Sequence, residues 1–259
     1  MQLYRSNGLH IYCLCFYCQV VYFVVSSDVQ SPINSLSVVV TAYNEEECLE
    51  IFISELLEFL NTQSQQYEII IVDDGSTDDT PSIIDKLQHQ FKTINALRLE
   101  KNTGMGAALK AGFKCSRLDW ITFFPADGQI KPTELMTMAQ AVLNEDLDCV
   151  TSMYFKRNYN LKRKIISAVI HNLTKFILGR DPQTQGIYML KKSVYDALNL
   201  YSNTFLFNLE LPVKVQNAGY KFRSVKIRLS PRIAGVSKAM QKPRIMSTLL
   251  EMLLVRLKG

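Results

Sequence analysis

The chain has 259 residues, and 47% of them are hydrophobic, which is enough for one α/β domain with a buried core. Its 29 Lys and Arg residues exceed its 24 Asp and Glu residues and give a formal net charge of +5, which suits anionic ligands or an anionic membrane surface. Basic runs interleaved with aromatic residues are missing from the sequence, which argues against a nucleic-acid partner, and no cysteine or histidine pattern matches a zinc site.

The first 35 residues differ in character from the rest of the chain. Arg5 precedes a run from Leu9 to Val25 that contains no charged residue and is rich in Tyr, Phe, Val and Cys. This run is at the short end of the ~20 residues that a helix needs to cross a bilayer. We therefore treat residues 1–35 as an apolar N-terminal extension that is either a membrane segment or a leader outside the fold.

Strands and helices alternate from Leu36 onwards. Short runs of mainly apolar residues predict buried strands at Leu36–Thr41, Tyr67–Val72, Ile94–Leu99, Trp120–Phe124 and Cys149–Met153. Apolar residues at helical period predict helices between them, at Glu45–Asn61, Thr80–Phe91, Gly106–Cys115 and Lys131–Leu143. This alternation predicts an α/β fold with a mainly parallel central sheet that helices cover on both faces.

The second half of the chain is less regular. Residues 193–218 are expected to be helical with a break near Ser202, and Phe222–Leu229 is expected to be a strand. Leu161–Leu178 and Ile245–Leu257 each carry one apolar face beside basic residues. Such a face belongs either to a core helix or to a helix that lies on a membrane surface. We assign residues 36–240 to one domain and 241–259 to an amphipathic C-terminal helix.

Three polar clusters directly follow predicted strands. They are Ala42-Tyr43-Asn44-Glu45 after the first strand, Asp73-Asp74-Gly75-Ser76-Thr77-Asp78 after the second, and Pro125-Ala126-Asp127-Gly128-Gln129 after the fourth. One such cluster would be ordinary turn chemistry. Ligands of parallel sheets bind beyond the carboxyl ends of the strands, so three clusters at one edge predict a binding site there.

The polar segments resemble those of a known enzyme family. Thr41–Glu45, Val72–Ser76, Asn102–Ala108 and Ala126–Gln129 are similar in order and spacing to glycosyltransferase family 2, over roughly residues 36–240. Asp181–Gly186, Phe207–Glu210 and Pro231–Lys238 resemble its dolichol-phosphate mannosyltransferase and polyprenyl-phosphate glucosyltransferase branch. The resemblance implies a Rossmann-like GT-A fold. It also implies inverting transfer of a hexose, glucose or mannose, from a UDP- or GDP-sugar to a polyprenyl or dolichyl phosphate.

The resemblance also implies a set of site residues. Nucleotide-sugar binding is expected at Ala42, Tyr43, Glu45, Asp73, Asp74, Gly106, Ala126 and Asp127. Asp127 and Glu210 are the expected catalytic residues, and Gln185, Arg232, Ser237 and Lys238 are expected to bind the acceptor phosphate. Other interpretations stay open: Glu45 as a helix cap, Asp127 as a turn residue, and Arg232 with Lys238 as a solvated loop or as donor-diphosphate ligands.

A divalent metal ion is the expected cofactor. The resemblance places Mg²⁺ or Mn²⁺ at Asp127 and Gln129, and such hard cations prefer oxygen ligands and absorb charge on a leaving diphosphate. Three positions depart from the family pattern. Pro125 stands where the family usually has Asp, Met105 stands where it often has a basic residue, and Tyr188 stands where it often has Arg or Lys. Each departure removes one possible contact to metal or phosphate.

The acceptor is expected to be a lipid phosphate at a membrane surface. A phosphate monoester is anionic near neutral pH and needs little general-base help, whereas a sugar hydroxyl needs a base. No dedicated base is evident beyond Asp127 and Glu210. We expect a membrane-associated protein with its catalytic domain on the cytoplasmic face. The alternatives are a family 2 transferase with a glycan or another lipid acceptor, and a catalytically impaired homologue that binds nucleotide sugars.

Overall fold

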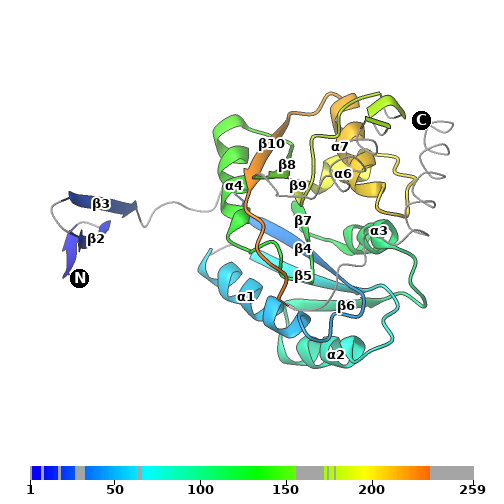
Figure 1. The fold of residues 1–259 in the computed structure, drawn as a ribbon, viewed down its shortest axis with the longest axis horizontal. Helices are drawn as coiled ribbons and strands as arrows, with labels where there is room; N and C mark the ends of the chain where they lie inside the picture. The colour runs from blue at the N-terminus through cyan, green and yellow to red at the C-terminus, as the bar shows by residue number, and fades with distance from the viewer. Residues whose placement is uncertain are drawn as a thin grey trace.

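The computed structural model describes residues 33–63, 66–155, 172–173, 175–177 and 179–233, together with three short strands near the N-terminus. Those strands are β1 (Gln2–Ser6), β2 (Leu9–Phe16) and β3 (Gln19–Ser26), and they form an antiparallel sheet of their own (Figure 1). The apolar run at Leu9–Val25 is therefore divided between two strands. Within the described parts of the chain, no helix combines the length and apolar character needed to cross a membrane.

A seven-stranded sheet in the order β10-β8-β9-β7-β4-β5-β6 organises the globular part (Figure 1). Its strands are β4 (Ser35–Ala42), β5 (Gln66–Asp73), β6 (Ile94–Arg98), β7 (Trp120–Pro125), β8 (Cys149–Tyr154), β9 (Tyr188–Lys191) and β10 (Phe222–Ile227). β9 runs antiparallel to its neighbours β7 and β8, and the remaining pairs are parallel. The predicted mainly parallel sheet is confirmed.

Helices pack on both faces of this sheet. They are α1 (Leu49–Thr62), α2 (Thr80–Gln90), α3 (Met105–Cys115), α4 (Glu134–Glu145), α6 (Lys192–Ala197) and α7 (Phe207–Asn217). Consecutive residues of a strand face opposite sides. On β7, Phe124 contacts Phe52 of α1 at a ring-centroid distance of 5.5 Å, while Phe123 contacts Tyr188, which in turn contacts Phe113 of α3. α1 and α3 therefore cover opposite faces.

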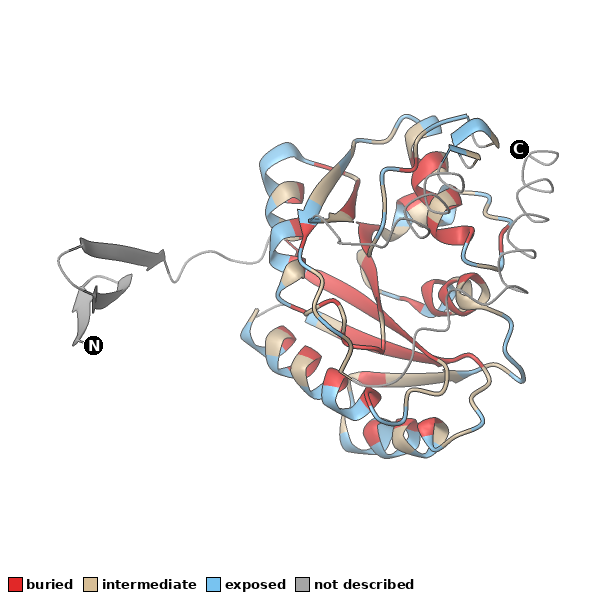
Figure 2. Ribbon diagram, in the orientation of Figure 1, coloured by how far each residue is buried: buried red, intermediate tan, exposed pale blue. Residues whose placement is uncertain are grey.

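The core lies along the central strands. All eight residues of β4 are buried, as are the last six of β5, and this continuous burial is what a strand covered on both sides shows (Figure 2). Burying one Val, Ile or Leu side chain contributes roughly 1.5–3 kcal/mol, so these strands are held firmly. The loops at their carboxyl ends consequently start from a rigid base.

The second half differs from the prediction in two places. Helix α6 ends at Ala197 and α7 begins at Phe207, so residues 198–206 form a loop where a nearly continuous helix was expected. β9 was not predicted at all. Most of the predicted helix Leu161–Leu178, and all of Ile245–Leu257, lie outside the described residues.

Candidate active site

The three polar clusters meet at the carboxyl edge of the sheet. β4 lies between β5 and β7, and the strand register sets Ala42 beside Asp73 and Thr41 beside Pro125. The Asp74 N–H donates to the Ala42 carbonyl over 2.9 Å, and the Ala126 N–H donates to the Thr41 carbonyl over 3.0 Å. The predicted site residues that directly follow these strands are therefore neighbours in space.

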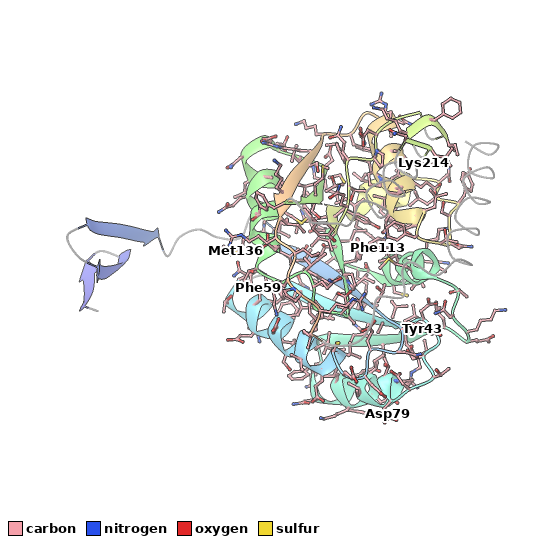
Figure 3. The ribbon with its side chains drawn as sticks, in the orientation of Figure 1. Tyr43, Phe59, Asp79, Phe113, Met136 and Lys214 are labelled. Atoms are coloured by element: carbon pink, nitrogen blue, oxygen red, sulfur yellow. The ribbon has the colours of Figure 1, made fainter. Side chains whose placement is uncertain are left out.

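Hydrogen bonds to side chains join the loop after β4 to the loop after β5. The Asn44 N–H donates to Ser76 Oγ, and the Glu45 N–H donates to Thr80 Oγ1, each over 2.9 Å. The Thr77 N–H donates back to Asn44 Oδ1 over 2.8 Å. Tyr43 directly follows β4 and precedes Asn44, and it is partly exposed (Figure 3). Its predicted role in nucleotide binding stays a prediction.

The two aspartates at the end of β5 shape the surrounding loops. Asp73 Oδ1 accepts the Ser76 N–H over 2.9 Å. Asp74 accepts the N–H and the hydroxyl of Thr103 on one oxygen and the Gly104 N–H on the other, at 2.8 to 3.0 Å. Both side chains are nearly fully buried. Asp74 thus holds the loop that leads into α3, a role that the sequence did not indicate.

Asp127 sits in a tight turn at the end of β7. Gly128 follows with a φ of 67°, a backbone conformation that glycine adopts without strain. The residue is only 6% exposed, and its Oδ1 accepts the Gln129 N–H over 3.1 Å. A buried carboxylate needs a partner for its charge, and the Gln129 N–H is a neutral donor.

Arg232, from the loop after β10, is a charged partner of Asp127. Arg232 Nη2 lies 2.9 Å from Asp127 Oδ2, and its Nη1 lies 3.9 Å from Glu45 Oε1. The loop is anchored on the same turn, because the Ser230 N–H donates to the Gln129 carbonyl over 2.8 Å. Arg232 was predicted to bind the acceptor phosphate. In the structure it lies beside Glu45, predicted to bind the nucleotide sugar, and Asp127, predicted to bind the metal.

Glu210 of α7 supports a neighbouring loop. It is fully buried, and its carboxylate accepts the Tyr201 and Ser202 N–H groups at 2.8 to 3.2 Å. That loop reaches the start of α3, where the Ala107 N–H donates to the Asn203 carbonyl over 2.9 Å. A Cβ on Gly106 would lie 2.3 Å from the Thr204 carbonyl oxygen, so glycine is needed for this contact. The geometry shows Glu210 and Gly106 as residues that place a loop, and their predicted site roles stay predictions.

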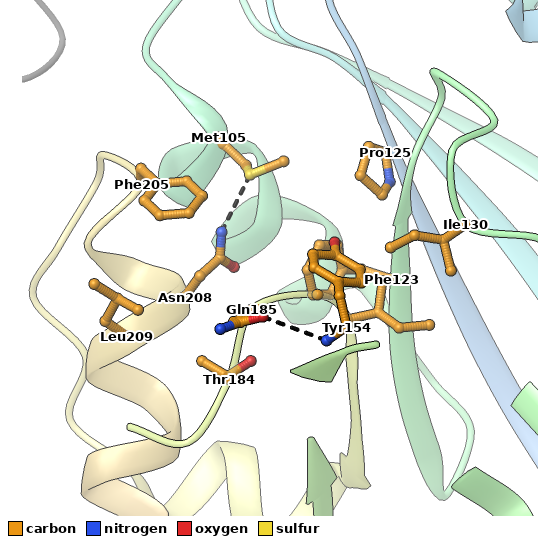
Figure 4. A pocket seen from close by; sticks show the side chains of 12 residues that line it. Met105, Phe123, Pro125, Ile130, Tyr154, Thr184, Gln185, Phe205, Asn208 and Leu209 are labelled. Atoms are coloured by element: carbon orange, nitrogen blue, oxygen red, sulfur yellow. Dashed lines mark hydrogen bonds between the residues drawn. The ribbon is translucent and has the colours of Figure 1, made fainter. Parts of the chain in front are cut away.

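A cavity opens beside the Asp127 turn, between the end of β7 and α7 (Figure 4). Its empty space is about 410 Å³, a figure that includes open solvent at its mouth. Gln185, predicted for the acceptor, lies in its wall, and its Oε1 accepts the Tyr154 N–H over 3.4 Å. The other two predicted acceptor residues, Ser237 and Lys238, lie outside the described residues.

Tyr188 lies beneath this cavity, where the family often has a cation. It is fully buried, and its hydroxyl donates to Asn208 Oδ1 over 3.3 Å. Burial raises the pKa of Tyr188 well above its usual value of 10, so the hydroxyl stays neutral. The sequence marked Tyr188 as a departure but gave no sign of its partner on α7.

Comparisons with known proteins agree with the resemblance. Residues 37–197, more than half of the chain, match the family described as glycosyl transferase family 2. An undecaprenyl-phosphate 4-deoxy-4-formamido-L-arabinose transferase of Photorhabdus laumondii is 33% identical over 155 residues, covering 60% of this chain and 47% of that protein. Its counterpart in Proteus mirabilis is 29% identical, covering 64% and 52%. The chain thus spans about half the length of these curated relatives.

Solved structures share the fold at low sequence identity. A mannosyltransferase of Pyrobaculum calidifontis in complex with GDP-Man and Mn²⁺ has a TM-score of 0.62 at 15% identity, covering 86% of this chain and 64% of that one. A glucosyl-3-phosphoglycerate synthase of Mycobacterium tuberculosis, solved with Mn²⁺, UDP and its product, has a TM-score of 0.65 at 19% identity, covering 86% and 80%. The chain therefore belongs to glycosyltransferase family 2 and has the GT-A fold.

Proposed function

We propose that this protein transfers a sugar, with inversion, from a nucleotide diphosphate sugar to a polyprenyl phosphate. The observation that carries the proposal is the convergence of Asp127, Glu45 and Arg232 beside the loops after β4 and β5. Two relatives named for undecaprenyl phosphate support the acceptor class. Glucose or mannose from UDP or GDP is the donor that the sequence resemblance favours, although the sugar in those relatives' names is a formamido-arabinose.

The reaction needs charge stabilisation more than proton transfer. An oxygen of the acceptor phosphate attacks the anomeric carbon, the bond from that carbon to the diphosphate oxygen breaks, and its electron pair leaves with the diphosphate. No proton moves in this step, so no general base is needed. The leaving group gains negative charge, and cations placed beside it beforehand lower the barrier.

The residues present fit a divalent cation with one adjustment. Asp127 and Glu45 already converge on one positive group, the Arg232 guanidinium, and Gln129 belongs to the same turn. Mg²⁺ or Mn²⁺ bound to Asp127 would supply the positive charge for the leaving diphosphate. Arg232 would first have to release Asp127, and its five N–H donors would then be available to a phosphate.

The remaining roles are the ones that the sequence resemblance implies, and the positions of the residues support them. Tyr43 and Asp73 lie at the strand ends where the nucleoside would bind, with Ala42, Asp74, Gly106 and Ala126 shaping the backbone around it. Gln185, Arg232, Ser237 and Lys238 remain the proposed acceptor ligands. The acceptor's lipid chain requires the domain to work at a membrane surface, and we place it on the cytoplasmic face.

A substrate panel tests the proposal. The protein is incubated with UDP- and GDP-sugars, Mn²⁺ or Mg²⁺ and a short-chain polyprenyl phosphate, and the lipid product is detected by mass spectrometry. Product formation with the lipid phosphate and not with free sugars or other lipids is expected. Binding of nucleotide sugars without turnover on any acceptor would instead favour an impaired homologue, which Pro125 and the Arg232–Asp127 ion pair make the second candidate.

A further inference from the structure

Two of the three departures from the family pattern line the cavity beside Asp127 (Figure 4), and the third contacts residues that line it. Met105 and Pro125 line it directly. Tyr188 lies behind the wall and donates its hydroxyl to Asn208, which also lines the cavity. Three positions at which the family often has a charged residue are thus all uncharged here, in or next to the wall of this cavity.

The wall of this cavity is mainly apolar. Ile130, Phe205 and Leu209 contribute hydrocarbon surface, and none of the described residues around the cavity is charged. The Asn208 amide is already engaged, because its Nδ2 lies 3.2 Å from the Met105 sulfur and its Oδ1 accepts from Tyr188. The Thr184 hydroxyl is buried without a hydrogen-bond partner in the described part of the chain, so it is a polar group left over for a ligand.

The position of the cavity indicates what enters it. Pro125 and Ile130 stand on either side of the Asp127 turn in sequence, and both line the cavity. In a nucleotide sugar the sugar is bonded directly to the diphosphate. If the diphosphate is neutralised at Asp127, the sugar therefore lies next to that turn, and this cavity adjoins it.

We propose that this cavity selects an uncharged donor sugar bearing a methyl-type apolar substituent, as in N-acetylated or deoxy sugars, over the parent hexose and over uronic acids. The inference rests on the proposed function and replaces the glucose or mannose that the sequence resemblance favours with an N-acetylated or deoxy derivative. A carboxylate here would be desolvated with no cationic side chain among the described residues that line the cavity, and each extra hydroxyl would meet hydrocarbon instead of water. One methyl-sized group in an apolar pocket changes discrimination by about 10- to 200-fold, which sets the expected size of the preference.

Calorimetry on the whole chain with Mn²⁺ tests the inference without requiring turnover. UDP is compared with UDP-glucose, UDP-N-acetylglucosamine and UDP-glucuronic acid, and GDP with GDP-mannose and its 6-deoxy counterpart GDP-rhamnose. In the nucleotide series that binds, the N-acetyl or deoxy sugar should bind about tenfold or more tightly than its parent hexose, and the uronic acid should bind weakest.

A positive charge placed in the cavity should change the order of these binding affinities. Met105→Lys should improve binding of UDP-glucuronic acid relative to UDP-N-acetylglucosamine by about tenfold or more, whereas Met105→Leu should preserve the original order. Met136→Lys is the matched control, because Met136 is 43% exposed on α4 (Figure 3). Circular dichroism verifies that each variant is folded.

Two outcomes overturn the inference while leaving the proposed function intact: equal or tighter binding of the parent hexose, or sugar nucleotides that bind no better than the bare nucleotide. Failure of every nucleotide and nucleotide sugar to bind would instead overturn the proposed function itself.

Discussion

The guanidinium of Arg232 occupies the position where the proposed reaction needs a metal ion. It lies 2.9 Å from Asp127 Oδ2, and its side chain is 21% exposed. A cation that binds Asp127 must displace it. Arg232 therefore competes with the metal for the only carboxylate in this turn, since Pro125 provides none.

Removing that competitor should strengthen metal binding. We predict that Arg232→Ala binds Mn²⁺ alone more tightly than the wild type. A charge-assisted hydrogen bond contributes about 1.5–3 kcal/mol, which corresponds to about ten- to a hundredfold in affinity at ~1.4 kcal/mol per decade. Paramagnetic resonance of free Mn²⁺ measures the change. Arg228→Ala, an exposed arginine of the same loop, is the control and should leave affinity unaltered. Equal Mn²⁺ binding by all three proteins would mean that the ion is held elsewhere.

Glu210 offers a second test at the scale of one residue. Its buried carboxylate holds the Tyr201 and Ser202 N–H groups, so Glu210→Gln should lower the free energy of unfolding by about 1.5–3 kcal/mol. Urea denaturation measures this loss. Glu47→Gln, at an exposed position before α1, should change stability little. A Glu210→Gln protein as stable as the wild type but without activity would support the catalytic role that the sequence predicts.

At the scale of elements, a buried glutamate joins three strands at the edge opposite the site. Glu68 of β5 accepts the Ser37 hydroxyl of β4 and the Arg117 N–H just before β7, each over 2.8 Å, and its other oxygen pairs with the Arg117 guanidinium. Burial alone would raise the pKa of Glu68, but the hydrogen bonds from Arg117 and Ser37 outweigh it and lower the pKa below its usual value.

This lowered pKa gives a stability change with a definite sign. A carboxylate with a depressed folded-state pKa stabilises the fold above its unfolded pKa, and this contribution disappears as the pH falls through the folded value. Glu68→Gln should therefore cost about 1–3 kcal/mol at pH 7, and the gap to the wild type should narrow below the usual glutamate pKa of about 4.3. Urea unfolding at pH 7 and pH 3 measures both. A gap that is equal at the two pH values would show that the charge of Glu68 does not contribute.

Elements with a local signal were predictable, and those made by distant contacts were not. The β-branched run of β4 and the helical spacing of apolar residues in α1 are visible in the sequence. β4 is buried on both faces and α1 on one, and burial determines which residue types occur. β9 is only four residues, Tyr188–Lys191, and it forms by pairing with both β7 and β8. Its existence depends on strands far away in the chain, which local patterns do not record.

The same distinction applies to the candidate site. Asp73 and Asp127 follow strands, so their meeting at one edge was predictable from strand order. The pairing of Arg232 with Asp127 was not, because it depends on how the loop after β10 folds back over the Asp127 turn. Tyr188 and Asn208 likewise meet only through packing of α7 against the sheet.

For the whole molecule, the proposed acceptor sets a requirement on where the catalytic edge works. A polyprenyl phosphate presents its phosphate at a membrane surface, so the catalytic edge must reach that surface. The net charge of +5 favours an anionic membrane, and basic residues flank the sequence from Ile245 to Leu257. Each Lys or Arg near an anionic surface contributes about 1 kcal/mol to attraction.

We therefore predict that the protein sediments with vesicles containing anionic lipid more than with neutral vesicles, and that high salt releases it. Replacing Lys242, Arg256 and Lys258 with Gln should weaken this binding by about a hundredfold, because about 3 kcal/mol of attraction is lost and ~1.4 kcal/mol equals one decade. The control replaces Lys92, Lys114 and Lys226, which are exposed on the globular domain and change the net charge equally. If both triple variants lose the same affinity, attraction depends on total charge alone, and the C-terminal segment is not the part of the chain that meets the membrane.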